Sequence, residues 1–340
     1  MIRATMLGCA GSKPSVLRDL TALLLQVEGR GILIDCGEGT QRSLMKTKSK
    51  IFDISVICLT HVHADHTFGL PGLLSSINQI IKNEGTYQSK EIVIIAPINC
   101  KNLMQAVTNM VGANRIQLRY IWLTEEVEEL EFDKMIIKAY KLKHSTDCYG
   151  FRVEEKINPH FSIEKATSSG LDSEAWKFLQ NGHNIISDRE FYSLRDITDG
   201  EVCKRSVAYA VDTLPCEGLA QCIQDASLAI VEGMYATNEE ALDKDKSQHL
   251  TMKEAIEIAK ANRVGELWIT HYSQAFLNPP LDLQKFMANE EDKGWAKCCD
   301  CGLTTDIVKN GESTSRSKAT LVSASNQRGG SDNVFHSKKK

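Results

Sequence analysis

The segment Thr60–His66 constrains this chain more than any other part of its sequence. It reads Thr-His-Val-His-Ala-Asp-His and directly follows Ile54–Leu59, a β-branched apolar run that predicts a buried strand. A strand end that runs into a tight turn can aim such side chains at one point, and imidazole and carboxylate groups suit metals such as zinc. The alternative, a polar loop in solvent, is rarely built from so many such groups. The predicted metal ligands in this segment are His61, His63, Asp65 and His66.

Four further residues are candidates for the same site because each lies at or near the end of a strand-like run. They are His144, Asp212, His249 and His271. Taken singly, each of these is more often a surface or capping residue, and only their joint placement at strand ends raises the expectation. A carboxylate at the end of the predicted strand Ser206–Val211 could bridge two ions. Three histidines lie in polar segments and are expected to play no part: His160, His183 and His336.

Strand-like and helix-like runs follow one another along the chain. The expected strands are Thr21–Glu28, Gly31–Asp35, Ile54–Leu59, Glu91–Ala96, Ile116–Leu123, Met135–Leu142, Ser206–Val211, Ser227–Glu232 and Glu266–Thr270. The expected helices are Gly39–Thr47, His66–Lys82, Asn99–Val111 and Thr251–Asn262. Some strands are consecutive and others are separated by helices, which predicts an α/β protein with mixed sheets covered by helices.

Composition bounds the remaining possibilities. The 340 residues are 42% hydrophobic with a net charge of −4, so an anionic partner would have to be bound by a local basic patch or by metals. No apolar run reaches the roughly 18 residues of a membrane span, and we expect no signal peptide. The 11 cysteines have no framework spacing, so we expect reduced thiols and a cytoplasmic location.

Two segments differ from the rest of the chain. Residues 154–205 are polar with weak secondary-structure signals, and at about fifty residues they are too long for a simple connection. Residues 313–340 are rich in Ser, Asn, Gly and Lys, and we expect a disordered polar tail. We therefore divide the chain into a domain over residues 1–312, with 154–205 inserted in it, and the tail.

The wider pattern resembles the short form of ribonuclease Z, the tRNA 3′-processing endonuclease family of the metallo-β-lactamase superfamily. The histidine-rich segment is the superfamily signature, and its extension through Gly-Leu-Pro-Gly-Leu-Leu is a trait of the family. The matching stretches occur in the family's order and cover roughly residues 1–310: Leu33–Arg42, Leu59–Leu74, His144–Phe151, Tyr209–Thr213, Ile230–Tyr235, His249–Met252 and Ile269–Ser273. One departure is mild, because Ala-Val-Asp-Thr stands where many relatives have Ser-Gly-Asp-Thr.

The resemblance implies the metallo-β-lactamase fold, an αββα sandwich of two mixed β-sheets flanked by helices. It also implies two divalent metal ions per subunit, most often zinc, although the same donors accept manganese or cobalt. One ion would be held by His61, His63 and His144, and the other by Asp65, His66 and His271. Asp212 would bridge the two, and Asp35 would hold the ligand loop by hydrogen bonds.

Catalytic roles follow from the same resemblance. The ions would activate a water for in-line attack on a phosphodiester. Asp65 would accept the proton of that water, and His249 would protonate the leaving 3′-oxygen, with Glu232 orienting its imidazole. The alternatives are that Glu232 is a strand-end carboxylate facing solvent and that His249 is a residue at a helix N-terminus.

The inserted segment occupies the place of the family's RNA-binding arm. Basic residues alternate there with aromatic ones, which suits phosphate contact and base stacking: Lys156, Lys165, Lys177, Arg189, Arg195, Lys204 and Arg205, with Phe161, Trp176, Phe178 and Tyr192. Acidic residues in the same segment reduce the positive field, so a merely solvated insertion is the alternative. The group Cys298, Cys299 and Cys301 could bind a soft metal, but ordinary thiols are expected because no second cysteine pair lies nearby.

The expected function is a metal-dependent endoribonuclease that removes the 3′ trailer from precursor tRNA and leaves a 3′-hydroxyl. The expected partners are precursor tRNA and a second copy of the chain in a homodimer, with no membrane. One alternative is a hydrolase of this fold that acts on small or cyclic phosphodiesters, and another is an inactive RNA-binding scaffold. The Gly-Leu-Pro-Gly-Leu-Leu stretch, the long insertion and the complete ligand set favour the endoribonuclease.

Overall fold

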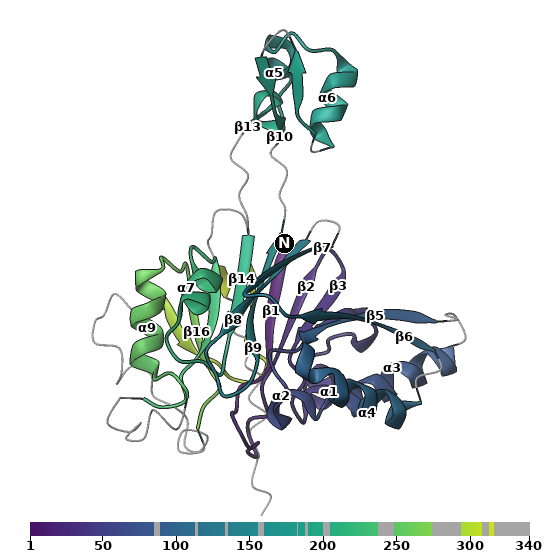
Figure 1. Ribbon diagram of the computed structural model, residues 1–340, viewed down its shortest axis with the longest axis vertical. Helices are drawn as coiled ribbons and strands as arrows, with labels where there is room; N and C mark the ends of the chain where they lie inside the picture. The colour runs from purple at the N-terminus through teal and green to yellow at the C-terminus, as the bar shows by residue number, and fades with distance from the viewer. Residues whose placement is uncertain are drawn as a thin grey trace, which may run out of the picture.

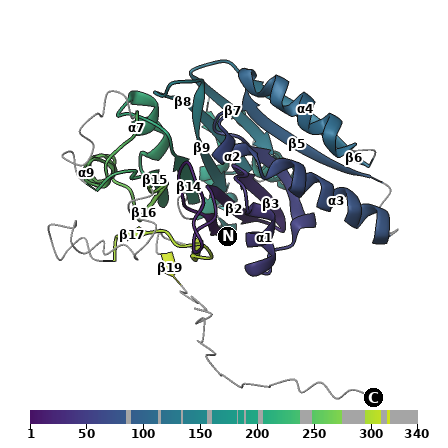
Figure 2. The ribbon, with the colours of Figure 1, turned by 90° about the horizontal axis from the view of Figure 1, so that it is seen from below.

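Two large β-sheets form the centre of the molecule and carry helices on their outer faces (Figure 1). The computed structural model describes residues 1–84, 89–112, 115–132, 135–155, 160–181, 183–187, 190–199, 205–236, 248–273, 294–307 and 313–315. Seen from below, the helices lie on either side of the paired sheets (Figure 2). This layering is the αββα sandwich that the resemblance implied.

The first sheet has eight strands in the order β19-β18-β1-β2-β3-β4-β5-β6. Its first part is antiparallel, and the strands from β3 to β6 are parallel. The bounds are β1 Ile2–Gly8, β2 Ala22–Val27, β3 Arg30–Ile34, β4 Ile54–Cys58, β5 Lys90–Pro97, β6 Ile116–Leu123, β18 Thr304–Ile307 and β19 Ser313–Ser315.

The second sheet has seven strands in the order β17-β16-β15-β14-β9-β8-β7. Strands β7, β8, β9 and β14 are antiparallel neighbours, and β14, β15, β16 and β17 are parallel. The bounds are β7 Val127–Phe132, β8 Met135–Leu142, β9 Cys148–Glu155, β14 Arg205–Ala210, β15 Leu228–Glu232, β16 Leu267–Thr270 and β17 Ala296–Cys298. The parallel part places several strand ends at one edge.

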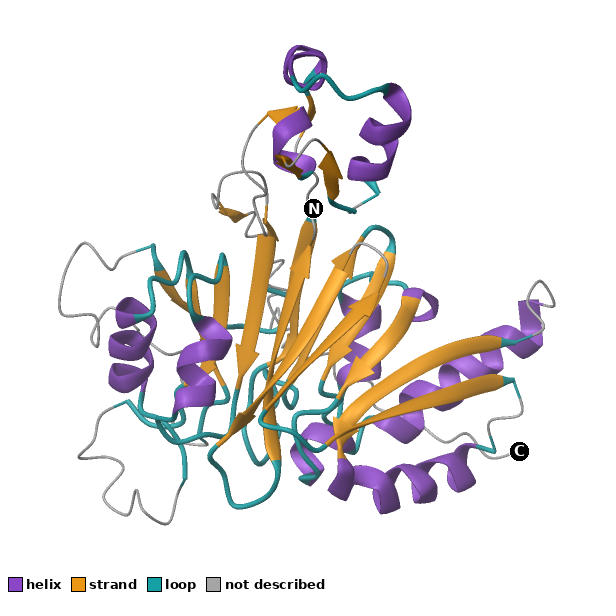
Figure 3. Ribbon diagram, turned by 45° about the horizontal axis from the view of Figure 1, so that its top comes forward, coloured by secondary structure: helices purple, strands orange, loops and turns teal. Residues whose placement is uncertain are grey.

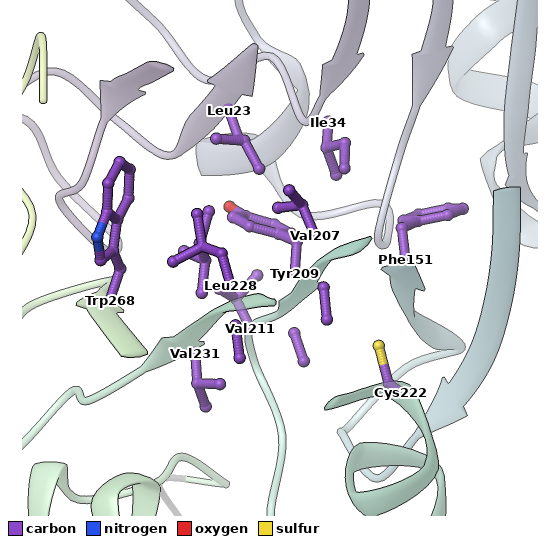
Figure 4. Packing of buried hydrophobic residues seen from close by; sticks show 14 of the residues in the cluster. Leu23, Ile34, Phe151, Val207, Tyr209, Val211, Cys222, Leu228, Val231 and Trp268 are labelled. Atoms are coloured by element: carbon purple, nitrogen blue, oxygen red, sulfur yellow. The ribbon is translucent and has the colours of Figure 1, made fainter. Parts of the chain in front are cut away.

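One hydrophobic core lies between the sheets. Leu23 and Ile34 of the first sheet face Val207 and Tyr209 of the second (Figure 4), and all four are fully buried. Every residue of β15 is buried, because one face packs into this core and the other lies under helices. This explains why the strand's sequence is a continuous apolar run rather than an alternating one.

The helices cover the two outer faces separately. Helices α1 (Thr40–Lys46), α3 (Leu70–Glu84) and α4 (Lys101–Val111) pack with the first sheet in a second core that includes Leu73 and Ile77. Helices α7 (Glu217–Ile223) and α9 (Met252–Ala261) cover the second sheet. Thr251 caps α9 in a capping box with Glu254.

The helix expected over His66–Lys82 is wrong as a single element. It is divided into α2 (Ala64–Thr67) and α3, with Pro71 in the first turn of α3. The break lies at Gly69, whose amide donates to the carbonyl of Cys36 at 2.8 Å, and a Cβ there would lie 2.3 Å from the carbonyl oxygen of Gly37. Close packing against a distant loop therefore ends α2, and no local pattern could reveal that contact.

The inserted segment folds into a small unit of its own. It contains α5 (Ile163–Ser168), α6 (Ser173–Gln180) and two short strand pairs, β10 with β13 and β11 with β12. Those strands are His160–Phe161, Thr198–Asp199, Ile185–Ser187 and Glu190–Tyr192. Three buried residues form its core: Ala166, Leu179 and Ile197. Figures 1 and 3 show this unit standing apart from the sheets, beyond β9 and β14.

Two expected boundaries need correction. Glu154, Glu155 and Arg205 belong to the second sheet, where Arg205 pairs with Glu155, so the insertion lies between residues 155 and 205. Ser313–Ser315 form β19 against β18 and are not part of a disordered tail, whereas residues 316–340 lie outside the described part. No helix in the described part of the chain is long and apolar enough to cross a membrane.

Candidate metal centre

The predicted ligands come together at one edge of the sandwich, where strands from both sheets end. His61 and the residues up to His66 follow β4 of the first sheet, while Asp212 and His271 follow β14 and β16 of the second. His144 lies between β8 and β9. Because β14, β15 and β16 are parallel and in register, their carboxyl ends present side chains at the same edge.

Asp212 lies at the middle of this group and turns one oxygen toward each side. Its Oδ2 lies 3.7 Å from Nε2 of His61 and 3.8 Å from Nε2 of His144. Its Oδ1 lies 3.3 Å from Nε2 of His66 and 3.1 Å from Nε2 of His271. The carboxylate therefore joins two sets of imidazoles.

The donor atoms form three overlapping groups with the chemistry of divalent metal sites. In the first, single atoms of His61, His63, His144 and Asp212 all lie within 4.8 Å of one another. The same holds for Asp65, His66 and His271, and for a third group made of Asp212, Glu232, His249 and His271. Imidazole and carboxylate donors in this combination suit zinc and similar ions.

The hydrogen bonding of the described residues provides a test of whether metal ions fit here. The Nε2 atoms of His61, His66, His144 and His271 are buried without a hydrogen-bond partner, and so is Oδ1 of Asp212. Buried polar atoms without partners cost free energy, so such a convergent set calls for bound cations. The residues present therefore fit the metal ions that the fold implies.

A layer of hydrogen bonds holds the ligands in place from behind. Oδ2 of Asp35 lies 2.7 Å from Nδ1 of His66, and Oδ1 of Asp35 accepts the amide of Thr60 at 2.8 Å. The hydroxyl of Thr60 lies 3.0 Å from Nδ1 of His61. Since these contacts use the Nδ1 atoms, the Nε2 atoms remain available to face the centre. Asp35 thus occupies the supporting position expected for it.

Backbone strain marks the three turns that carry site residues. Asp35, Asp212 and His271 each come just after a strand, and their φ angles are 59°, 55° and 59°. A non-glycine residue in this left-handed region costs about 1–2 kcal/mol. Such strain gathers at functional sites, where it re-aims a side chain. Asp and His are among the non-glycine residues that adopt this conformation most often, but their presence alone does not predict it.

Asp65 is held by a backbone group that sequence reasoning missed. The amide of Ser12 donates to Oδ2 of Asp65 at 2.8 Å, and this oxygen also lies 3.5 Å from Nε2 of His271. Burial alone would favour the neutral acid, but the neighbouring imidazoles of His271 and His66 lower the pKa of Asp65 overall. Asp65 is therefore an anion whose position is fixed.

Glu232 lies under the centre and contacts three other groups. It is fully buried, its Oε2 lies 2.7 Å from Nδ1 of His249 and 3.5 Å from Nδ1 of His271, and its Oε1 accepts the amide of Thr213 at 2.5 Å. Burial alone would lower the pKa of His249, but the neighbouring Glu232 carboxylate raises it overall. His249 also lies beside His144, with ring centroids 5.6 Å apart.

His183 and the cysteine group belong to no group of potential metal ligands among the described residues. His183 stacks on Phe178 in the inserted unit, at 4.4 Å between ring centroids, and His336 lies outside the described residues. Burial raises the pKa of the Cys298 thiol to about 12, as for an ordinary buried thiol.

Comparison with known proteins agrees with this architecture. Residues 18–83 match the model of the metallo-beta-lactamase superfamily. The ribonuclease Z of Clostridioides difficile (strain 630) is 34% identical over 288 residues, covering 84% of this chain and 92% of that protein. The ribonuclease Z of Agathobacter rectalis is also 34% identical, over 278 residues, covering 82% of this chain and 89% of that protein.

Solved structures share the same fold. The crystal structure of human tRNase Z, short form, has a TM-score of 0.60 at 22% identity and covers 90% of this chain and 99% of its own. The metallo-beta-lactamase fold protein YhfI from Bacillus subtilis has a TM-score of 0.62 at 17% identity, with coverages of 89% and 98%. The fold and the clustered donors thus define a hydrolase of the metallo-β-lactamase type. Within that class, the chain belongs to the ribonuclease Z family.

Proposed function

We propose that this protein is an endoribonuclease that removes the 3′ trailer from precursor tRNA and leaves a 3′-hydroxyl on the tRNA. Membership of the ribonuclease Z family supports the reaction and the substrate. The observation that carries the chemistry is the position of Asp212, whose two oxygens each face a different pair of imidazoles. Such an arrangement suits two ions that act together on one phosphodiester.

Two divalent ions per chain are the proposed cofactors. His61, His63 and His144 would hold one, Asp65, His66 and His271 the other, and Asp212 would contact both. When bound, the ions supply Lewis-acid activation of a water and stabilise charge on the phosphodiester. The imidazole-rich donor set favours zinc, and manganese or cobalt could occupy the same positions.

Asp65 is the proposed proton acceptor for the attacking water. It is anionic, and the amide of Ser12 fixes one of its oxygens at 2.8 Å. A base that is held in place needs no reorganisation when the proton moves, which favours this role over that of a passive ligand.

His249 is the proposed donor of a proton to the leaving 3′-oxygen. Glu232 engages its Nδ1 at 2.7 Å, which leaves Nε2 for the substrate. The carboxylate also raises the pKa of His249 against the effect of burial, and this favours the protonated form that a general acid needs. Glu232 is buried, so its alternative role as a strand-end group facing solvent is disfavoured.

The inserted unit is the proposed RNA-binding arm of a metallo-β-lactamase domain that includes β19, Ser313–Ser315. Phe178 is 49% exposed and stacks with His183, and Phe191 is 63% exposed, so both offer surfaces for base stacking. Arg205 is not assigned to this arm, because its guanidinium pairs with Glu155 at 2.9 Å. Lys204 lies outside the described residues.

We also propose a homodimer in the cytoplasm. Val16, Leu17 and Phe68 are exposed apolar side chains that an interface with a second copy could cover. The described cysteines are all free thiols, which supports a reducing compartment. Light scattering at micromolar concentration tests the dimer, and a mass of one chain would contradict it.

Cleavage of a precursor tRNA with a 3′ trailer tests the proposed function. In the presence of zinc or manganese, we expect a single cut just after the discriminator nucleotide, and we expect a chelator to abolish it. If the protein hydrolyses a small or cyclic phosphodiester but does not cut the precursor, the proposed metal chemistry stands and the proposed substrate is wrong.

A further inference from the structure

A cavity of about 630 Å³ opens beside His144. Neither the proposed metal ions nor the proposed proton transfers occupy it. It lies between the end of β8, the segment leading to β9 and the start of α7. Asn99, Lys143, Thr146 and Glu217 are among its lining residues. Its volume lies within the ~300–1,000 Å³ range of small-ligand sites, which is the size class of a single nucleotide.

Lys143 is fixed relative to the metal centre by its backbone. Its amide donates to the hydroxyl of Thr213 at 3.3 Å, and its carbonyl accepts the amide of Leu214 at 2.9 Å. These contacts attach it to the turn that presents Asp212, and His144 is the next residue in the chain. The side chain of Lys143 therefore starts from a fixed point next to the candidate metal ligand His144.

Two lysines, Lys141 and Lys143, line this cavity. Within the described part of the chain, Lys143 is the one without an acidic partner. Lys141 is within ion-pair distance of Glu126 at 3.6 Å and Asp147 at 4.0 Å, and Glu217 accepts a hydrogen bond from Gln221 at 2.8 Å. Glu126 and Asp147 thus face the ammonium of Lys141, while Lys143 is an exposed residue. An exposed ammonium beside a phosphodiester-cleaving centre suits an RNA phosphate.

The position of the cavity indicates which part of the RNA enters it. In-line displacement places the attacking water and the leaving oxygen on opposite sides of the phosphorus. Asp65, the proposed base, lies 3.6 Å from Nε2 of His66 and 3.5 Å from Nε2 of His271, whereas the cavity adjoins His144, which belongs to the other proposed set of metal ligands. The cavity therefore lies away from the proposed base, on the side that in-line geometry gives to the leaving 3′-oxygen and the tRNA product.

We propose that this cavity binds the 3′-terminal nucleotide of the tRNA product and that Lys143 contacts the phosphate on its 5′ side. The proposal rests on the proposed function and adds a subsite to it. The hydroxyl of Thr146, which accepts a hydrogen bond from Asn99 Nδ2 at 2.8 Å, lines the same cavity and is placed to contact the ribose or base.

Binding of three RNAs to the metal-loaded protein tests this subsite. The first is a tRNA acceptor-stem hairpin that ends in the discriminator nucleotide, the second is the same hairpin shortened by that nucleotide, and the third is a 5′-phosphorylated trailer oligonucleotide. None of them carries the bond that is cut. Lys143→Glu is compared with Lys82→Glu, a matched change of an exposed lysine near the end of α3.

We expect Lys143→Glu to weaken binding of the full hairpin about tenfold, because a charge-assisted contact becomes a repulsion. The dependence of log K on log salt should fall by about one unit. Binding of the shortened hairpin and of the trailer should stay within twofold of wild type, and Lys82→Glu should change none of the three. Lys143→Gln should give an intermediate loss for the full hairpin.

Two results would overturn the subsite. One is equal binding of the full hairpin by Lys143→Glu and wild type, and the other is a loss confined to the trailer. If the wild-type protein still cleaves precursor tRNA, either result contradicts the subsite and leaves the proposed function intact. If wild type neither binds the full hairpin nor cleaves the precursor, the proposed function fails together with it.

Discussion

Glu232 joins the two sides of the site, because its Oε2 lies 2.7 Å from Nδ1 of His249 while its Oε1 accepts the amide of Thr213. Thr213 follows Asp212, so one buried carboxylate positions both the proposed proton donor and the turn of the bridging ligand. This contact connects β15 with the end of β14 and with the segment before α9.

Replacing Glu232 by Gln should reduce turnover of precursor tRNA by about 10²–10⁴-fold, the usual contribution of a general acid. His249→Ala should do the same, and the double variant should be no worse than either single one, because both changes remove one function. Both variants should hydrolyse bis(p-nitrophenyl) phosphate nearly as well as wild type, since its leaving group needs no proton. Additive losses, or equal losses on both substrates, would contradict the assignment.

Asp65→Ala should abolish turnover while the melting temperature of the metal-free protein changes little, because the residue lies on a loop at the sheet edge. Steady-state cleavage and thermal unfolding of the two proteins measure this. Ser12→Pro removes the amide that donates to Asp65. It should lower turnover more than Ser12→Gly, which keeps the amide and accommodates the φ of 61°. Near-normal hydrolysis by Asp65→Ala would remove this residue from the mechanism.

Removal of metal should destabilise the folded protein, because buried Nε2 atoms lose their partners. We expect chelation to lower the melting temperature and Asp212→Ala to lower the metal content below two ions per chain. Elemental analysis by mass spectrometry and calorimetry measure the two effects. A metal content of two ions in Asp212→Ala would show that the carboxylate does not bridge them.

The ionisation of Asp19 should make the free energy of unfolding depend on pH in the acidic range. Burial would raise the pKa of this carboxyl, but Ser43, Arg42 and Lys46 lower it overall, with Arg42 at 2.6 Å and Lys46 at 3.2 Å. A lowered folded-state pKa gives stability that is present above the unfolded pKa of about 3.9 and is lost as the pH falls through the folded value.

The corresponding variant is Asp19→Asn. It should lower the free energy of unfolding by about 1–3 kcal/mol at pH 7, the cost of a lost hydrogen-bonded charge. The difference from wild type should shrink at pH 3, and urea denaturation at both pH values measures it. An equal difference at the two pH values would show that the ionised form is not the stabilising one.

Phe178→Ala in the inserted unit should weaken binding of precursor tRNA because it removes a stacking surface. The expected loss is about 1–3 kcal/mol for each base that stacks on it. Hydrolysis of a small phosphodiester should not change, since the unit lies apart from the metal centre. Met110→Ala, a change of a similarly exposed residue on α4, serves as the control. Loss of small-substrate hydrolysis in Phe178→Ala would argue against a separate arm.

The sequence predicted those parts of the structure that depend on local patterns of residues. The apolar run before His61 is a strand, and the strand ends carry Asp212 and His271 as expected. The fold itself followed from motif resemblance rather than from periodicity, which predicted only mixed sheets covered by helices.

Other features depend on contacts between distant segments. Strand β9 was missed because Arg152 and Glu154 make it look polar, yet the two side chains pair at 2.8 Å and are buried together. The amide of Ser12 and the backbone contacts of Lys143 are equally invisible, since main-chain groups carry no sequence signal. The helices of the inserted unit were missed because its core is small.

Cleavage of precursor tRNA in water enriched in oxygen-18 shows which product receives the oxygen of the attacking water. If the protein is the proposed endoribonuclease, we expect one cut after the discriminator nucleotide, with the label in the 5′-phosphate of the released trailer and none in the 3′-hydroxyl of the tRNA. We also expect this labelled product to disappear in Asp65→Ala. Label on the tRNA, a 2′,3′-cyclic phosphate end, or no cut in the precursor would contradict the account.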